Sequence, residues 1–285
     1  MKKEKSSSSG LHIRRAVAYA VLLLLTLICL FAFWMLFINA TRAHADIQKG
    51  FSILPGKAFF RNVDNVVHNK TMLILNGLFN SVFIATATAI LSVYFSAMTA
   101  YAIHVYDFKL KKVAFNFILV IMTIPTQVSA LGFVKLITGM NLKDSFIPLI
   151  IPSIAAPAVF FFMKQYMESA LPLEIVEAAR IDGSNEFHTF NAVVMPIMKP
   201  ALAVQAIFTF VTSWNNYFTP SLVLTKATKK TLPLWIAYLR SADFAKFDMG
   251  QVYMMIAFSI FPVMIVYLIL SKFIVQGVAL GSVKG

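Results

Sequence analysis

Six long apolar runs, separated by short polar breaks, constrain this chain of 285 residues more than any other feature of its sequence. A helix needs about 20 mostly apolar residues to cross the hydrocarbon core of a bilayer, and each run reaches that length. The runs are continuous rather than alternating, which favours helices over the strands of a membrane barrel. We therefore predict an all-α polytopic membrane protein with six transmembrane helices, at about residues 17–38, 80–103, 113–137, 146–167, 201–224 and 252–274.

The charged residues exclude two other classes of protein. Only 13% of the residues are charged and 59% are hydrophobic, whereas soluble domains have about 25% and about 45–50%. The net charge of +13 would suit a nucleic-acid-binding protein only if it formed a basic face on a soluble fold. Lys and Arg lie mainly between the apolar runs, where they anchor helix ends at lipid headgroups. We therefore expect contact with membrane lipid and none with nucleic acid.

The first apolar run admits a second interpretation, because Ala43-His44-Ala45 after it resembles a signal-peptidase site. The apolar core of a signal peptide is usually about 7–15 residues long and this one has about 22, so we favour an uncleaved first span. Five basic residues among the first fifteen place the N-terminus in the cytoplasm, and six crossings return the C-terminus there. The chain then divides into a cytoplasmic tail (1–13), a membrane domain (14–275) and a second cytoplasmic tail (276–285).

Two features inside the spans predict how the helices pack. Small residues recur every four positions in two sets on the second span, which lets helix backbones approach closely; they are Ser81, Ala85 and Ala89, then Ser92, Ser96 and Ala100. Prolines within the spans break or kink helices, which is tolerated where neighbouring helices or a water-filled path satisfy the freed backbone groups. A kinked structural bundle explains most of these prolines, but their number favours a transport path; they are Pro125, Pro148, Pro152, Pro157, Pro220 and Pro262.

The segment 168–200 differs from the other polar breaks. Pro172 suits the first turn of a helix, and helix-forming residues continue to Ile181. Asp182-Gly183 then permits a sharp reversal, after which Ser184 or Asn185 can cap a second helix from about Glu186. A cytoplasmic loop of about 33 residues is too small for a catalytic core of its own but can dock onto one. It offers the carboxylates of Glu177 and Asp182 and a close-approach surface at Ala178 and Ala179. It also offers apolar anchors at Phe187 and Phe190.

The same segment carries a motif. It contains Glu177-Ala178-Ala179-Arg180-Ile181-Asp182-Gly183, followed by Val194-Met195-Pro196. This resembles the EAA motif of the permease subunits of ABC importers, with Val193 and Met195 in place of the Ile and Leu of that motif. The fuller E-A-A-R-I-D-G-S, the run from Trp214 to Pro220 and the terminal residues are similar to the carbohydrate-uptake branch, and more narrowly to its maltose-type second permease subunit. The resemblance covers nearly the whole chain.

The resemblance implies a type I (MetI-like) permease architecture in a bacterial plasma (inner) membrane. It also implies import of a sugar or oligosaccharide by a complex with a second, different permease subunit, two cytosolic ATPase subunits and an extracytoplasmic solute-binding protein. ATP and Mg²⁺ are then held by the ATPase, and this chain, which has no phosphate-binding G-x-x-x-x-G-K-[ST] sequence, binds no cofactor and is not an enzyme. The EAA segment couples to the ATPase through Glu177, Ala178, Ala179, Asp182, Gly183 and Pro196.

Two further groups of residues predict contacts. Trp214, Asn215, Asn216 and Tyr217 put polar and aromatic groups into an apolar run, either to line a sugar path or to bond the partner subunit. By the resemblance the terminal residues Gln276, Gly277 and Lys284 contact the ATPase; the alternative is a frayed terminus.

Three other functions compete with sugar import. Within the importer class, the solute is a sugar or instead a polyamine, phosphate or peptide. An ion-coupled secondary transporter would need ionisable residues at the bilayer midplane, and the spans hold almost none. A membrane-embedded enzyme would need paired catalytic groups, and neither those nor a metal-ligand cluster is evident.

Overall fold

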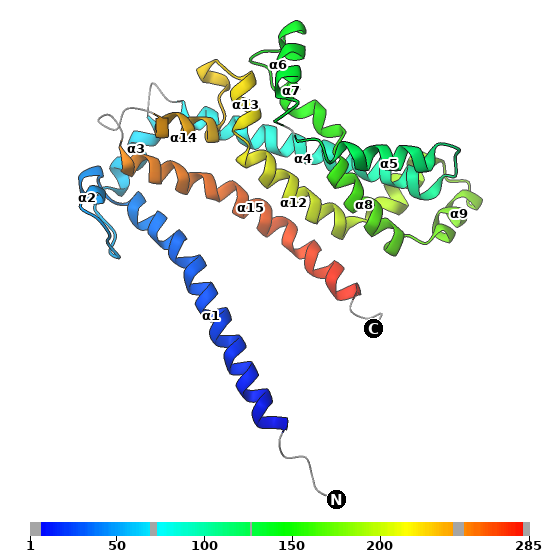
Figure 1. Cartoon of the computed structure of the whole chain (residues 1–285), viewed down its shortest axis with the longest axis horizontal. Coiled ribbons are helices and arrows are strands. Elements are labelled where there is room, and N and C mark those ends of the chain that lie inside the picture. Colours follow the sequence, from blue (N-terminus) through cyan, green and yellow to red (C-terminus); the bar gives the residue numbers. More distant parts are fainter. Residues whose placement is uncertain (1–6, 69–72, 126, 242–247, 282–285) are drawn as a thin grey trace, which may run out of the picture. The chain divides into compact units, whose positions relative to one another are not determined.

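The computed structural model describes residues 7–68, 73–125, 127–241 and 248–281, and every regular element in these ranges is a helix (Figure 1). The chain forms two compact units. Unit 1 comprises Met1–Asn69 and Ala242–Phe258, and unit 2 comprises Lys70–Ser241 and Ser259–Gly285. The last helix, α15 (Met249–Gly281), contributes its first turns to unit 1 and the remainder to unit 2.

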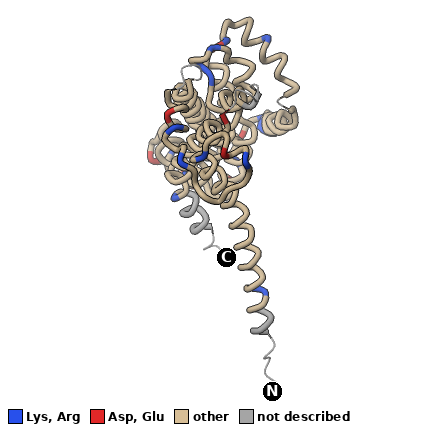
Figure 2. Tube along the Cα trace, turned by 90° about the vertical axis from the view of Figure 1, so that its left-hand side faces the viewer, with Lys and Arg blue, Asp and Glu red and all other residues tan. Residues whose placement is uncertain are grey.

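Unit 1 begins with α1 (Ser7–Ala40), which starts earlier than the predicted first span and, from Ala16 onward, is apolar on all sides. Residues 16–41 carry no Lys, Arg, Asp or Glu, so this part of the tube is uniformly tan in Figure 2. Leu25 and Trp34 expose 52% and 51% of their surface. A helix that is apolar all round belongs in lipid or against another chain, which agrees with a first membrane span.

The segment after α1 is ordered by polar side chains around two short helices, α2 (His44–Gln48) and α3 (Phe59–Val67). Asn62 is fully buried, and its Nδ2 donates to the carbonyls of Ala40 and Arg42, at 2.8 and 2.9 Å. The Arg42 guanidinium donates to Asn39 Oδ1 and to the carbonyls of Asp46 and Gly50. The bond to the Ala40 carbonyl satisfies one of the backbone acceptors that the end of α1 leaves unpaired, and the other bonds hold the chain that follows α1.

Unit 2 is organised around α4 (Ile74–Val105), a continuous helix of 32 residues. Its small residues are buried as predicted; Ser81, Ala85, Ala89, Ser92, Ser96 and Ala100 are each at most 6% exposed. They allow α8 (Pro157–Ala170) and α12 (Lys199–Asn215) to pack closely along α4. The same face adds two side-chain bonds, from Ser96 Oγ to the Ala156 carbonyl and from Ser153 Oγ to the Thr88 carbonyl, each at 3.4 Å.

The remaining elements of unit 2 are short. Before α8 lie α5 (Lys111–Ile121), α6 (Ala130–Gly139), α7 (Ile147–Ile150) and the 3-10 helix η1 (Ile151–Ile154). Between α8 and α12 lie α9 (Leu173–Ile181), α10 (Glu186–His188), the π-helix η2 (Thr189–Val194) and α11 (Met195–Ile197). After α12 come α13 (Phe218–Val223), the 3-10 helix η3 (Ala227–Lys229) and α14 (Leu232–Ser241).

The predicted spans at 113–137 and 201–224 are not single helices, and the predicted span at 146–167 is built from α7, η1 and α8. The first is interrupted between α5 and α6, where Pro125 lacks the N–H that a helix needs and disfavours helical backbone in the residue before it. The second is interrupted at Asn216, whose backbone is extended. The Asn216 side chain stabilises this break, because its Oδ1 accepts from the Thr219 N–H and its Nδ2 donates to Thr219 Oγ1, both at 3.2 Å.

Four helical stretches of the described chain are long and apolar enough to cross a membrane: His12–Ala40, Ile74–Val105, Ile147–Ala170 and Met249–Phe273. A fifth crossing is possible where Glu186–Ile197 and Lys199–Asn215 meet at an angle of 82°. The protein is therefore an α-helical, multi-pass membrane protein, and the predicted number of six spans is not confirmed.

Gly250 tests the packing of unit 1. A Cβ at this position would lie 2.7 Å from the Arg42 carbonyl oxygen and 2.8 Å from Asn62 Nδ2. A carbon atom that is not bonded to these atoms cannot approach them so closely. Gly250→Ala should therefore lower the free energy of unfolding by about 1–3 kcal/mol, the usual effect of overpacking. The measurement is the thermal unfolding midpoint in detergent. Gly132→Ala is the control, since its Cβ meets no atom within 4 Å, and an equal loss of stability in both variants would contradict the expectation.

Candidate functional site

The segment 171–198 connects α8 to α12, and its first helix, α9, has well-defined ends. Pro172 is the residue before α9, with an extended backbone, rather than part of its first turn as predicted. At the other end Gly183 has a φ of +81°, its N–H donates to the Arg180 carbonyl, and the Ser184 N–H donates to the Ala179 carbonyl, both at 3.0 Å. This pair of bonds is a Schellman motif, which ends helices at a glycine. The predicted reversal at Asp182-Gly183 is confirmed.

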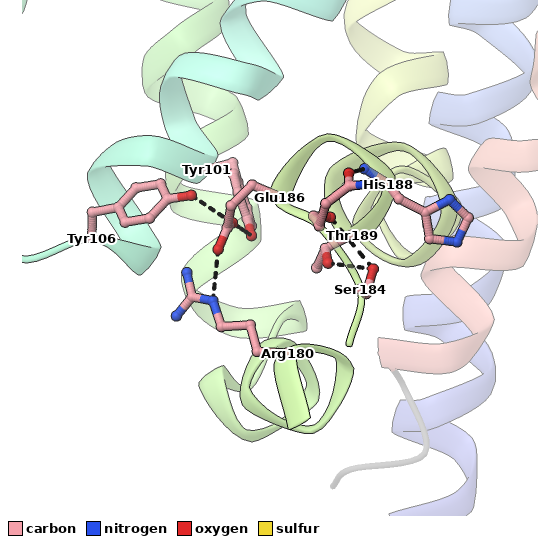
Figure 3. A network of polar contacts seen from close by, with 8 residues as sticks. Tyr101, Tyr106, Arg180, Ser184, Glu186, His188 and Thr189 are labelled. Carbon is pink, nitrogen blue, oxygen red and sulfur yellow. Dashed lines mark hydrogen bonds and ion pairs between the residues drawn. The ribbon is translucent and has the colours of Figure 1, made fainter. Parts of the chain in front are cut away.

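The second half of the segment is helical but irregular. Asn185 is the cap of α10, because its Oδ1 accepts from the His188 N–H at 2.9 Å. Ser184, the alternative cap, instead accepts a hydrogen bond from Thr189 Oγ1 at 2.8 Å (Figure 3). Pro196 and Pro200 lie in the first turns of α11 and α12, where a proline is tolerated. The chain therefore passes from α10 to α12 almost without leaving helical geometry.

One face of this segment is exposed and mixes apolar with acidic side chains. Ile181 and Phe187 expose 86% and 72% of their surface. Glu177, Ala178 and Asp182 are also exposed, while Ala179 is partly covered. We call Glu177, Ala178, Ile181, Asp182 and Phe187 the docking surface. Exposed apolar side chains rimmed by charge are typical of a protein interaction site.

The opposite face of the segment is anchored in the core of unit 2. Val176 and Phe190 expose only 1% and 3% of their surface. The Phe190 ring packs against the rings of Tyr94 and Tyr101 from α4, with centroids 5.7 and 5.5 Å apart. The prediction that Phe190 is an exposed anchor was therefore wrong, because aromatic partners on α4 bury it.

A polar cluster joins the same segment to the end of α4 (Figure 3). Arg180 Nε donates to Glu186 Oε1 at 2.8 Å. The hydroxyls of Tyr101 and Tyr106 both donate to Glu186 Oε2, the first at 3.0 Å. We call Arg180, Glu186, Tyr101 and Tyr106 the clamp. No local pattern marks Tyr101, Tyr106 or Glu186 as site residues, because the tyrosines lie 80 or more positions before Glu186.

The clamp favours an ionised carboxylate. The hydrogen bond from Arg180 lowers the pKa of Glu186 below its ordinary value, and the hydrogen bond from Tyr106 lowers it further. In the same contact, the carboxylate of Glu186 raises the pKa of Arg180. Both groups are therefore charged at neutral pH, and the pair is a charge-assisted hydrogen bond.

A second group of predicted residues lies at the break between α12 and α13. Trp214 is 3% exposed and its ring stacks on that of Phe210, with centroids 5.8 Å apart, so it packs inside the unit. Both polar atoms of the Asn216 side chain form hydrogen bonds with Thr219. Asn215 and Tyr217 are exposed, and together with Trp214 they line one side of a pocket of about 540 Å³ whose other side includes Ile236 and Ala237 of α14.

The predicted C-terminal contact residues separate into two groups. Gln276 and Gly277 belong to α15, which continues to Gly281, so the last span does not give way to an irregular tail at residue 276. Lys284 lies outside the described residues.

Comparisons with known proteins agree on one family. The family model of the binding-protein-dependent transport system inner membrane component matches residues 93–280. The arabinooligosaccharides transport system permease protein AraQ of Bacillus subtilis (strain 168) is 33% identical over 269 residues, which cover 92% of this chain and 93% of AraQ. The sn-glycerol-3-phosphate transport system permease protein UgpE of Yersinia pestis bv. Antiqua (strain Antiqua) is 28% identical over 91% of this chain and 94% of its own length.

A solved structure has the same fold. It is a chain of a bacterial ABC transporter involved in the import of the acidic polysaccharide alginate. The two chains superpose with a TM-score of 0.79 at 23% sequence identity, over 95% of this chain and 99% of that one.

The lowered pKa of Glu186 predicts a pH dependence with a definite sign. A carboxyl whose pKa is lower in the folded state stabilises the fold above its ordinary pKa of about 4.3, and this contribution is lost as the pH falls through the lowered value. Glu186→Gln, which cannot ionise, should lower the unfolding midpoint at pH 7 and make it less sensitive to acidification to about pH 3. Thermal unfolding of both proteins between pH 7 and 3 checks this, and equal pH profiles would contradict it.

Proposed function

Because this chain belongs to the family of binding-protein-dependent transport system inner membrane components, we propose that it forms part of the path by which an ABC importer carries a sugar or oligosaccharide into the cytoplasm. The chain is a permease subunit and not an enzyme. Three features support import of a saccharide: the similarity to an arabinooligosaccharide permease, the fold shared with an alginate importer, and the E-A-A-R-I-D-G-S sequence of residues 177–184. The similarity to UgpE keeps a phosphorylated polyol as the second candidate.

The docking surface supports a cytosolic ATPase as the partner of the segment 171–198. In the proposed complex, Ile181 and Phe187 enter an apolar cleft of the ATPase, and Glu177 and Asp182 pair with basic groups at its rim. Ala178 and Ala179 allow close approach, and Gly183 sets the turn that follows Ile181. Pro196 lies beyond this surface, so its contribution is to the shape of the segment. The observation that carries the proposal is a surface with exposed apolar groups on a segment whose other face is buried.

The same reasoning gives the rest of the complex. A second, different permease subunit, two ATPase subunits and an extracytoplasmic solute-binding protein complete it, in a bacterial plasma (inner) membrane. ATP and Mg²⁺ are bound by the ATPase. The segment 171–198 and both termini then face the cytoplasm, with Gln276, Gly277 and Lys284 near the ATPase. In support, the clamp is at the C-terminal end of α4, a few residues before the basic cluster of Lys109, Lys111 and Lys112, and basic residues favour the cytoplasmic side.

The pocket at the α12–α13 break is a candidate contact for the transported solute. An aromatic ring packs on the apolar face of a sugar, and an amide bonds its hydroxyls. Tyr217 and Asn215 are exposed and can do both, whereas Trp214 and Asn216 are engaged within the chain. We therefore assign contact with the solute to Tyr217 and Asn215, and a structural role to Trp214 and Asn216.

Ile181→Asp tests the docking surface. A carboxylate inside an apolar cleft loses its hydration, so ATPase co-purified with the permease and ATP-dependent sugar uptake in proteoliposomes should each fall at least about tenfold. Phe60→Asp is the control for co-purification, because Phe60 is 83% exposed and lies on α3, far along the chain from the docking surface. Undiminished ATPase binding by Ile181→Asp would contradict the docking assignment. Uptake of sn-glycerol 3-phosphate but of no saccharide by the wild-type complex would favour the second candidate solute.

Tyr217→Ala tests contact with the solute. The variant loses the contact of the ring with the solute, which contributes about 0.5–1.5 kcal/mol, so uptake should be roughly twofold to tenfold slower. The amount of ATPase bound to the permease should stay unchanged. Tyr267→Ala is the matched control, since Tyr267 and Tyr217 expose 55% and 56% of their surface but Tyr267 lies on α15 outside the pocket. Equal uptake rates by the two variants would contradict the assignment of Tyr217 to contact with the solute.

A further inference from the structure

The clamp fixes the docking segment to α4 at more than one point. Glu186 is on α10 and Arg180 on α9, so the ion pair closes the turn between these two helices. Both oxygens of the Glu186 carboxylate are used, one by Arg180 and the other by the hydroxyls of Tyr101 and Tyr106 (Figure 3). A single carboxylate therefore holds three elements together, which apolar packing alone, being non-directional, does not do.

Neighbouring contacts restrict how the clamp can move. The Arg180 guanidinium lies 5.5 Å from the centroid of the Tyr106 ring, and the rings of Tyr101 and Tyr106 meet edge to face at 6.0 Å. At the start of the segment, a ring nitrogen of His104 lies 3.0 Å from the Leu171 carbonyl oxygen. The end of α4 is thus bonded to the chain both just before α9, at Leu171, and just after it, at Glu186.

The opposite end of α4 is also fixed by polar bonds. Asn80 Nδ2 donates to the carbonyls of Thr228 and Lys230, both at 3.0 Å, and the Leu232 N–H donates to Ser81 Oγ at 2.8 Å. The backbone N–H groups of Thr225 and Lys226 donate to Asp144 in turn, which ties the loop before α7 to the same region. Figure 1 shows α9 near one end of α4 and α14 beside its other end.

Between these two ends α4 is a rod. Its 32 residues span about 48 Å at 1.5 Å per residue and contain no proline, whereas the predicted spans at 113–137 and 201–224 are broken. A displacement of one end of an unbroken helix reaches the other end, whereas a break absorbs it.

We propose that the clamp makes the docking segment and α4 one rigid lever, which carries movement of the docked ATPase across the membrane to the segment 225–232. This inference rests on the proposed function, since it assumes that an ATPase binds the docking surface. Tyr101, Tyr106 and Glu186 are then positioning residues: they do not touch the solute or the ATPase but determine whether ATP hydrolysis moves the transport path.

The test separates docking from transmission. Tyr101→Phe with Tyr106→Phe removes both hydroxyls and leaves the rings and the docking surface in place. In proteoliposomes this variant should bind ATPase as the wild type does, but the number of solute molecules imported per ATP hydrolysed should fall at least about fivefold. Glu186→Gln should lower this ratio as well, but because it also removes the ion pair with Arg180 that orders the docking surface, it should in addition weaken ATPase binding. Glu168→Gln is the control, because its ion pair with Lys164 joins two residues of α8 and connects no separate elements.

The distance between two spin labels measures the transmitted movement directly. It would not change with the clamp if the clamp only stabilised the fold. A label at Thr228, with a reference label at Phe208 of α12, should report a nucleotide-dependent distance change in the wild type and in Glu168→Gln, but not in the double tyrosine variant. Combining Arg180→Glu with Glu186→Arg restores the ion pair with reversed polarity and should recover part of the lost coupling. If the double tyrosine variant fails to accumulate, Tyr106→Phe alone, at a partly exposed position, replaces it.

The outcomes distinguish the two proposals. Normal ATPase binding with lost coupling supports the lever. Normal binding with normal coupling overturns it, and so does loss of ATPase binding in the tyrosine variant, which would make the clamp a part of docking. Failure of the wild type itself to bind an ATPase would overturn the proposed function instead.

Discussion

In the hydrocarbon core of a bilayer, a backbone N–H or C=O without a partner costs several kcal/mol, and the arrangement of unit 2 depends on this constraint. α4 meets it alone, as an unbroken helix with small residues buried along one face. The interrupted helices cannot meet it alone, because each break frees backbone groups. They need protein beside them, and α8 and α12 find it along α4. The continuous helix is thus the support on which the broken ones depend.

The same constraint decides where polar side chains can connect elements. From Ile74 to Val105, α4 carries no Lys, Arg, Asp or Glu, and its side-chain bonds to distant segments near its middle are few and long. Its shorter bonds to distant segments lie near the two ends, through Asn80 and Ser81 at the start and through Tyr101, His104 and Tyr106 at the finish. An apolar rod with polar fixings at its ends suits the transfer of movement between two aqueous faces.

Local patterns in the sequence were enough for some of these features and not for others. Gly183 could be placed in a turn because Asp-Gly after a helix needs only its immediate neighbours, and the small residues of α4 could be assigned to packing from their spacing. The break at Asn216 was missed, because it depends on a side chain that caps the following turn in an otherwise apolar run. Phe190 was misplaced and Tyr101 overlooked for a shared reason: their partners come from another helix, far away in the sequence.

One contact of the clamp, the ion pair of Arg180 with Glu186, also bears on how tightly a partner can bind the docking surface. Exposed Ile181 and Phe187 gain free energy when covered, at about 25 cal/mol for each Å² of apolar surface removed from water. Part of that gain is lost if the surface has to be ordered on binding. Here the Schellman turn at Gly183, the buried Val176 and the ion pair of Arg180 with Glu186 hold the surface in shape before any partner arrives. Contacts that make the segment a rigid lever therefore also reduce the entropy cost of docking, so rigidity serves binding and transmission together.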